Sequence, residues 1–303
     1  MELITGENDK GRRLDRILRK ALPDHPLPLI HRLLRQGHVL VNGKPGKAQD
    51  RLDCGLIIKI PSIKNKNINK NNKNGRKTSA AEINLPPPDI IWQDAGLLAV
   101  NKPSGISVHG LNSLDSIVQS FLKDKLPPSL SFKPGPLHRL DKPTSGIVIF
   151  STNIEGARLF SSLMRERKVR KTYLTIVEGI IKKEEIWQDD LVRDREKKKT
   201  FVSDLEISGK PAVTKVIPLA VDGNHTLIKA EITTGRTHQI RAQAAFHGYP
   251  LAGDIKYGGH RLKNGSLFLH AWKLEFLNFS LEAPIPSFPQ ISLLNRVLLT
   301  KNP

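Results

Sequence analysis

A run of lysine and asparagine divides this chain of 303 residues into two parts. The composition changes at Ser62 and recovers near Asp89, and residues 64–75 hold little except these two residue types. Such a segment cannot bury enough apolar surface to offset the entropy that ordering would cost. The three prolines that end it favour a stiff, extended exit. We therefore predict three parts: a small N-terminal domain at 1–61, a flexible linker at 62–88 and a larger domain at 89–303.

The charge of the chain favours a polyanionic partner. Lysine and arginine number 48 against 29 aspartates and glutamates, which gives a formal net charge of +19. A charge of this sign and size points first to nucleic acid, although a device for solubility would also explain it. No long basic amphipathic helix stands out, so we expect no membrane partner. The N-terminal residues lack the basic-then-apolar order of a signal peptide, no apolar stretch approaches transmembrane length, and we expect a cytoplasmic protein.

The residue types also narrow the range of cofactors. Cys54 is the only cysteine, so neither a disulfide framework nor a cysteine zinc site can form. The sequence shows no carboxylate cluster, histidine pair at zinc spacing, dinucleotide fingerprint or phosphate-binding loop. We expect no metal, no cofactor and no obligate protein partner.

The N-terminal domain is predicted to hold two short helices and a small sheet. Apolar residues repeat at helical spacing within residues 14–22 and again within 29–34. Strands are expected at 39–44, where the chain enters an Asn-Gly turn, and at 56–60. Arginines lie between the apolar positions of both helices and suit phosphates, although a charged helix face is often only solvated. The candidate RNA contacts here are Arg13, Arg16, Arg32, Arg35 and Lys44.

This segment resembles the S4 RNA-binding domain over about residues 11–61. The resemblance rests on R-L-D beginning at Arg13, on R-L-L-R-Q-G beginning at Arg32, and on V-L-V-N-G-K beginning at Val39. It implies that the two helices dock on structured RNA.

The larger domain alternates strand and helix patterns. Strands are predicted at 97–102, 147–150, 173–177, 212–217, 227–232 and 267–276, and helices at 114–126, at 154–167 and from Thr237 to His247. We interpret the charged stretch from Lys182 to Lys199 as an exposed loop. Two element types mixed along one segment predict an α+β fold: a mixed, largely antiparallel sheet with helices attached, beside a small α/β N-terminal domain.

One loop of the larger domain holds a carboxylate among basic groups. Asp141 lies within the run from His138 to Gly146, and the apolar run at 147–150 that follows predicts a buried strand. The loop should therefore be fixed to the edge of a sheet. On residue type alone, Asp141 could bind a metal, form a salt bridge or attack a substrate. Three further segments place polar groups at the ends of predicted elements: 101–105, 171–179 and 233–242.

Together these segments resemble the RluA family of pseudouridine synthases, and most of all its C branch, which acts on large-subunit ribosomal RNA. The sequence H-R-L-D-K-P-T-S-G surrounds Asp141, T-G-R-T-H-Q-I-R ends at Arg241, and the similarity extends over residues 90–280. The resemblance implies isomerisation of uridine to pseudouridine, in which the bond between N1 and C1′ breaks, the uracil turns, and C5 joins C1′. This chemistry needs neither a redox step nor a group donor, in keeping with the absence of a cofactor motif.

The resemblance also implies catalytic roles for three residues. Asp141 corresponds to the nucleophile, since a carboxylate can attack a glycosidic carbon; attack at C1′, attack at uracil C6 and formation of a glycal all stay open. Arg241 corresponds to its charged partner, which would keep the carboxylate ionised and fix its position. Tyr173 corresponds to an aromatic side chain that can stack on the flipped uracil and move the C5 proton.

Further residues are candidates for holding the RNA or the flipped base. Arg139 corresponds to a side chain that fills the gap left when a base leaves its stack. His138 would shape the loop or contact RNA, and Arg170 and Lys171 belong to a basic block beside the tyrosine. Lys102, at a strand end, suits either packing or a phosphate contact. Two alternatives stay open: a transfer RNA substrate, or a non-catalytic RNA-binding factor for ribosome assembly.

Overall fold

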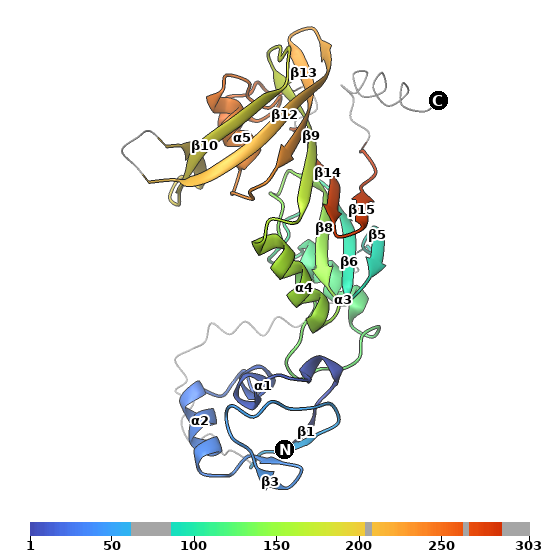
Figure 1. Cartoon of the computed structure of the whole chain (residues 1–303), viewed down its shortest axis with the longest axis vertical. Coiled ribbons are helices and arrows are strands. Elements are labelled where there is room, and N and C mark those ends of the chain that lie inside the picture. Colours follow the sequence, from blue (N-terminus) through green and yellow to red (C-terminus); the bar gives the residue numbers. More distant parts are fainter. Residues whose placement is uncertain (62–85, 204–207, 263–266, 287–303) are drawn as a thin grey trace. The chain divides into compact units, whose positions relative to one another are not determined.

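The computed structural model describes residues 1–61, 86–203, 208–262 and 267–286 (Figure 1). Most of the predicted linker at 62–88 therefore lies outside the described residues. The chain divides into two compact units. The first comprises Met1–Pro87, Gln119–Pro134 and Thr152–Ile154, and the second comprises Pro88–Val118, Gly135–Ser151 and Glu155–Pro303. The first unit thus contains two short segments that follow residue 89 in the sequence.

The first unit packs two helices against a small sheet. Its elements are β1 (Glu2–Ile4), the 3-10 helix η1 (Glu7–Asp9), α1 (Leu14–Ala21), α2 (Leu27–Arg35), β2 (Leu40–Val41), β3 (Lys44–Pro45) and β4 (Ile57–Lys59). The strands pair antiparallel in the order β1-β4-β2-β3. The apolar faces that were predicted for α1 and α2 pack into one core, which contains Leu14, Ile17 and Ile30. The predicted Asn-Gly turn joins β2 to β3, with φ of 46° at Asn42 and 81° at Gly43, as a type I′ turn requires.

A buried carboxylate connects η1 to a distant segment of the same unit. Asp9 is fully buried and accepts hydrogen bonds from the backbone N–H groups of Gly6, Leu130 and Ser131 at 2.9–3.0 Å. The hydroxyls of Ser129 and Ser131 donate to it as well. Burial alone would raise the pKa of Asp9, but these hydrogen bonds outweigh burial and hold the pKa below its usual value. This contact could not be predicted from the sequence, because Ser129, Leu130 and Ser131 lie 120–122 positions from Asp9.

The second unit is built on one large sheet (Figure 1). In the described part of the chain its strands follow the order β11-β10-β12-β13-β9-β14-β8-β6-β5, with β15 paired to β14 and β7 to β8. They are β5 (Ile90–Asp94), β6 (Leu97–Lys102), β7 (Gly135–Pro136), β8 (Ser145–Ser151), β9 (Arg170–Glu178), β10 (Glu185–Asp194), β11 (Lys199–Val202), β12 (Lys210–Asp222), β13 (His225–Ile232), β14 (Leu269–Phe276) and β15 (Phe279–Glu282). Of these pairings, β8 with β14 is parallel and the others are antiparallel.

The remaining helices are α3 (Leu114–Leu122), α4 (Ile154–Arg165), α5 (Gln239–Phe246) and the 3-10 helix η2 (Ile255–Tyr257). Ser113 caps α3, as its hydroxyl accepts a hydrogen bond from the backbone N–H of Ser116 at 3.3 Å. None of the described helices is long and apolar enough to cross a membrane. The predicted α+β fold, with its mixed and largely antiparallel sheet, is confirmed.

A close approach of β14 fixes the start of β8, which follows the loop that carries Asp141. Ser145 and Gly146 pair with His270 and Ala271 in parallel register. Gly146 has a φ of 107°, and a Cβ there would overlap the carbonyl oxygen of Ala271. Because β9 flanks the other edge of β14, the loop before β8 and strand β9 come to the same region of the sheet (Figure 1).

The prediction of an exposed loop from Lys182 to Lys199 is wrong. Most of this stretch forms β10, which pairs with β11 on one side and β12 on the other. Within β10, Trp187 and Leu191 are buried while charged neighbours face outward. An antiparallel strand with one solvated face can carry this many charges. Because charged residues are so frequent here, the alternation of buried and exposed positions was not recognised in the sequence.

Candidate active site

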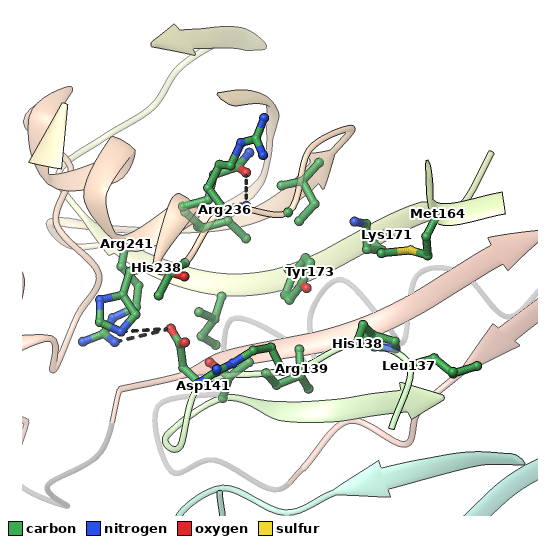
Figure 2. A pocket seen from close by; sticks show the side chains of 18 residues that line it. Leu137, His138, Arg139, Asp141, Met164, Lys171, Tyr173, Arg236, His238 and Arg241 are labelled. Atoms are coloured by element: carbon green, nitrogen blue, oxygen red, sulfur yellow. Dashed lines mark hydrogen bonds and ion pairs between the residues drawn. The ribbon is translucent and has the colours of Figure 1, made fainter. Parts of the chain in front are cut away.

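A cavity of about 290 Å³ in the second unit gathers three segments that are far apart in the sequence (Figure 2). The loop before β8 contributes Arg139 and Asp141, β9 contributes Tyr173, and the turn and helix that follow β13 contribute His238 and Arg241. The rest of the lining mixes apolar side chains, such as Met164 on α4 and Leu269 on β14, with polar ones, such as Lys171 and Arg236. The three predicted catalytic residues therefore lie around one space.

Two nitrogen atoms converge on the carboxylate of Asp141. Its Oδ2 lies 3.5 Å from Nη1 of Arg241 and 3.6 Å from Nε2 of His238 (Figure 2). The Asp141 side chain is 17% exposed, so one part of it still faces open space. Both separations exceed the 2.7–3.2 Å of a good N–H···O hydrogen bond. The carboxylate is therefore oriented by charge without being capped by tight hydrogen bonds.

The guanidinium of Arg241 is held from behind by a second carboxylate. Nε and Nη2 of Arg241 donate to the two oxygens of Asp254 at 2.6 and 2.8 Å, and the side chain of Asp254 is 1% exposed. This bidentate pairing takes one edge of the guanidinium, and Nη1 is the nitrogen that faces Asp141. Burial alone would lower the pKa of Arg241, but Asp254 outweighs burial and raises it. Asp254 was not predicted from the sequence. The glycine beside it marks a loop but does not indicate a functional residue.

The ring of His238 contacts Tyr257, a residue that was not predicted from the sequence. The hydroxyl of Tyr257 accepts a hydrogen bond from the backbone N–H of Thr200 at 2.8 Å and lies 2.7 Å from Nδ1 of His238. Burial lowers the pKa of His238 to about 4, so the ring is neutral at pH 7. If the tyrosine donates to Nδ1, the ring proton lies on Nε2 and faces Asp141. His238, with a φ of 55°, also occupies the N-cap of α5, where Thr237 was predicted.

The loop that carries Asp141 is supported by a buried lysine. Lys102, at the end of β6, is fully buried and its ammonium donates to the backbone carbonyls of Pro103, Ile106 and Lys142 at 2.7–3.2 Å. Burial lowers its pKa to about 8, and the charge of Asp141 opposes that shift. Of the two roles that the sequence left open for Lys102, packing fits this position.

Tyr173 lies in the cavity on β9 (Figure 2). Burial, with a smaller contribution from the charge of Asp141, raises the pKa of its phenol. The hydroxyl is therefore protonated at neutral pH. A protonated phenol can stack on a base and donate a hydrogen bond, but it cannot act as a preformed base.

The remaining candidates of the second unit differ in their surroundings. Arg139 is exposed and Lys171 is half-buried, and both line the cavity. Nε2 of His138 accepts a hydrogen bond from the backbone N–H of Ile149 at 3.0 Å, and burial, with the charge of Lys171, lowers its pKa to about 3. That histidine is neutral and holds the start of the loop. Arg170 is exposed and lies outside the cavity lining.

The candidates of the first unit lie mostly on its surface. Arg16, Arg32, Arg35 and Lys44 are exposed. Arg13 instead pairs with the carboxylate of Asp15 through Nε at 3.1 Å and Nη2 at 2.8 Å. Its guanidinium is therefore less free to bind a phosphate than those of Arg16, Arg32 and Arg35.

Comparisons with known proteins identify the families that the two parts of the chain match. Residues 96–246 match the family model described as RNA pseudouridylate synthase, and residues 12–58 match the S4 domain. The chain is 33% identical over 284 residues to ribosomal large subunit pseudouridine synthase C of Haemophilus influenzae, which covers 90% of this chain and 86% of that protein. It is 31% identical over 304 residues to ribosomal large subunit pseudouridine synthase D of Neisseria meningitidis serogroup A, covering 91% and 76%.

A solved structure supports the same fold. The structure of human RNA pseudouridylate synthase domain containing 4 is similar with a TM-score of 0.57 and 25% sequence identity, over 68% of this chain and 91% of that one. These matches confirm both resemblances that the motifs suggested. One is to the S4 domain, and the other is to the pseudouridine synthases whose motif surrounds Asp141.

Proposed function

The chain belongs to the RNA pseudouridylate synthase family, and from that membership we propose that it isomerises specific uridines of large-subunit ribosomal RNA with Asp141 as the nucleophile. Relatives with this substrate in their names match about nine tenths of the chain. The S4 match and the net charge of +19 support an RNA partner. The enzyme would act where this RNA is present, in the cytoplasm.

The observation that carries the proposal is the setting of Asp141. Arg241 and His238 orient its Oδ2 from 3.5 and 3.6 Å, and Asp254 keeps the guanidinium from closing on it. A carboxylate that is positioned but not capped keeps lone pairs available for a carbon atom. Attack at C1′, attack at C6 and proton removal that forms a glycal are all compatible with this geometry.

The apolar part of the cavity suits the uracil. Met164, Ile232 and Leu269 line it together with Tyr173, and such walls favour a flat base and exclude water. After the N1–C1′ bond breaks, the base turns and C5 joins C1′, and the C5 proton must then leave. Burial raises the pKa of the phenol, so the hydroxyl of Tyr173 already carries a proton. Tyr173 would therefore accept the C5 proton only if it donated its own proton at the same time.

Arg139 is exposed at the side of Asp141. Extruding a base costs a few kcal/mol, and we assign Arg139 to filling the gap in the stack. His138 would contribute indirectly, because its ring accepts from the backbone of Ile149.

The test is to map pseudouridine in bulk RNA that has been treated with the enzyme. Wild type should modify at least one uridine of large-subunit ribosomal RNA, and Asp141→Ala should lower the rate at that site by about 1,000-fold or more. Asp222→Ala, which removes an exposed carboxylate at the end of β12, serves as the control and should leave the rate unchanged. If wild type makes no pseudouridine in any RNA, the activity is refuted. Product confined to transfer RNA would refute the substrate.

A further inference from the structure

We infer that a second cavity, which meets the first at Asp141, binds the phosphodiester of the nucleotide whose base is isomerised. This cavity has a volume of about 390 Å³. It shares Arg139, Leu140, Asp141, His238 and Arg241 with the first cavity. The inference rests on the proposed function, because it concerns how that substrate lies across the two spaces.

The residues that the two cavities do not share differ in chemistry. The first cavity adds Tyr173 and apolar side chains such as Met164 and Leu269, which suit a base, and it also adds the polar side chains of Lys171 and Arg236. The second adds His109, Lys142 and Lys256, which are exposed and polar. With the shared Arg139 and Arg241, the second cavity has four cationic side chains and one lining carboxylate, that of Asp141; Asp254, outside the lining, matches one of the four, Arg241. A space with that balance of charge attracts an anion.

Three of these cations have no carboxylate partner. Within the described residues, no ion pair involves Arg139, Lys142 or Lys256. The ammonium of Lys256 donates to the carbonyl of Lys198 at 2.9 Å, which leaves two of its donors free. The charge of Arg241, by contrast, is already matched by Asp254. The free cations are therefore the ones that can hold a phosphate.

The connectivity of a nucleotide fits this arrangement. A ribose carries the base at C1′ and the phosphates at its other end, so a nucleotide whose sugar lies at Asp141 extends in two directions. If the uracil enters the apolar cavity, its phosphodiester lies on the other side of Asp141, where Lys142 and Lys256 are. The second cavity would thus distinguish a nucleotide within a strand from a free uridine.

The first experiment measures affinity for an RNA that contains the uridine mapped above, at several salt concentrations. Lys142→Gln with Lys256→Gln should weaken binding about tenfold and lower the salt slope by about 1 to 2. Lys256→Gln is also measured alone, because Lys142 adjoins Asp141 in the sequence. Lys182→Gln with Lys183→Gln is the matched control, since these exposed lysines line neither cavity. Equal effects of the two double variants would overturn the inference.

The second experiment changes the RNA. Each diester next to the target uridine is replaced in turn by an uncharged methylphosphonate. One replacement should weaken binding to wild type about tenfold but weaken binding to the double lysine variant less than twofold, because the same contact is already lost. If neither replacement affects wild type, or if both proteins lose affinity equally, the inference fails. Pseudouridine formation in the same reactions reports on the proposed function separately.

Discussion

Asp254 competes with Asp141 for one guanidinium. It takes Nε and Nη2 of Arg241 at 2.6 and 2.8 Å and leaves Nη1 at 3.5 Å from Asp141. Without the charge of Asp254, Arg241 could turn toward Asp141 and form the tight bidentate pair that guanidinium and carboxylate prefer. In such a pair, hydrogen bonds from the guanidinium would occupy the lone pairs of the Asp141 oxygens, which a nucleophile needs. Asp254 is therefore a positioning residue for Arg241.

We expect Asp254→Asn to lower kcat about 10- to 100-fold while changing the affinity for RNA less than threefold. If Asp254 acts through Arg241, adding Asp254→Asn to Arg241→Gln should cost no further activity. Single-turnover rates with saturating RNA measure both effects. Asp189→Asn is the control, because Asp189 also bonds α5, accepting from Gln243 at 2.6 Å, but lines neither cavity. Independent, multiplicative losses would contradict the positioning role.

At the residue scale, part of the site could be predicted from the sequence. Its motifs predicted Asp141 and Arg241 as neighbours, and the structure places them 3.5 Å apart, although their catalytic roles stay predictions. Asp254 and Tyr257 could not be predicted in the same way. Their contacts depend on how the glycine-containing loop folds back over α5, and no local spacing encodes that path.

At the scale of elements, the contact between β8 and β14 sets the position of the loop that carries Asp141. The parallel register pairs Gly146 with Ala271, and the backbones approach too closely there for any Cβ. The last glycine of the motif around Asp141 is therefore required by packing, and the turn alone would not explain it. The apolar run after this glycine could be predicted as a strand, but its parallel partner lies 125 residues away and could not be predicted.

Gly146→Ala should destabilise the protein by roughly 3 kcal/mol or more, because it adds steric overlap to backbone strain. Gly223→Ala is the matched control: Gly223 has a φ of 54°, and nothing lies within 4 Å of an added Cβ. It should cost only about 1 kcal/mol. Urea unfolding of the three proteins measures the difference, and equal losses in the two variants would show that strain alone matters.

The contact of Asp9 makes part of the first unit sensitive to acid. Its pKa lies below the usual value in the folded protein because hydrogen bonds to Ser131, Gly6 and their neighbours outweigh burial. A carboxyl whose folded pKa is depressed adds stability above its unfolded pKa of about 4, and this stability is lost as the pH falls through the folded value.

Asp9→Asn should therefore increase hydrogen exchange at the backbone N–H groups of Leu130 and Ser131, which donate to this carboxylate. Near neutral pH the loss of local stability should be about 2 kcal/mol. The difference from wild type should shrink at about pH 3. Asp24→Asn removes an exposed carboxylate and should leave exchange at these positions unchanged. A difference that persists undiminished in acid would refute the role of ionised Asp9.

At the scale of the whole molecule, the net charge of +19 is shared by surfaces with different tasks. Cations around the second cavity would hold the target nucleotide, whereas the exposed arginines of α1 and α2 would hold RNA elsewhere. The sequence could predict these arginines because helical spacing alone determines that Arg16, Arg32 and Arg35 face solvent. It could not predict that Arg13 pairs with Asp15.

Removing residues 1–61 would test the first unit poorly, because it would also remove Asp9 and leave Leu130 and Ser131 without their acceptor. Neutralising charge in the full chain avoids this problem. Arg16→Gln, Arg32→Gln and Arg35→Gln combined should weaken RNA binding and lower its salt slope by about 2 to 3, since each lost phosphate contact removes about 0.7 to 0.9.

The matched control for this triple variant removes the same charge from exposed lysines that line neither cavity: Lys182→Gln, Lys183→Gln and Lys210→Gln. The arginine variant should keep the wild-type rate at saturating RNA, because these arginines lie outside both cavities. A salt slope equal to that of the lysine control would mean that the helices of the first unit do not bind RNA. A normal slope with a lower saturated rate would place them instead in a step after binding.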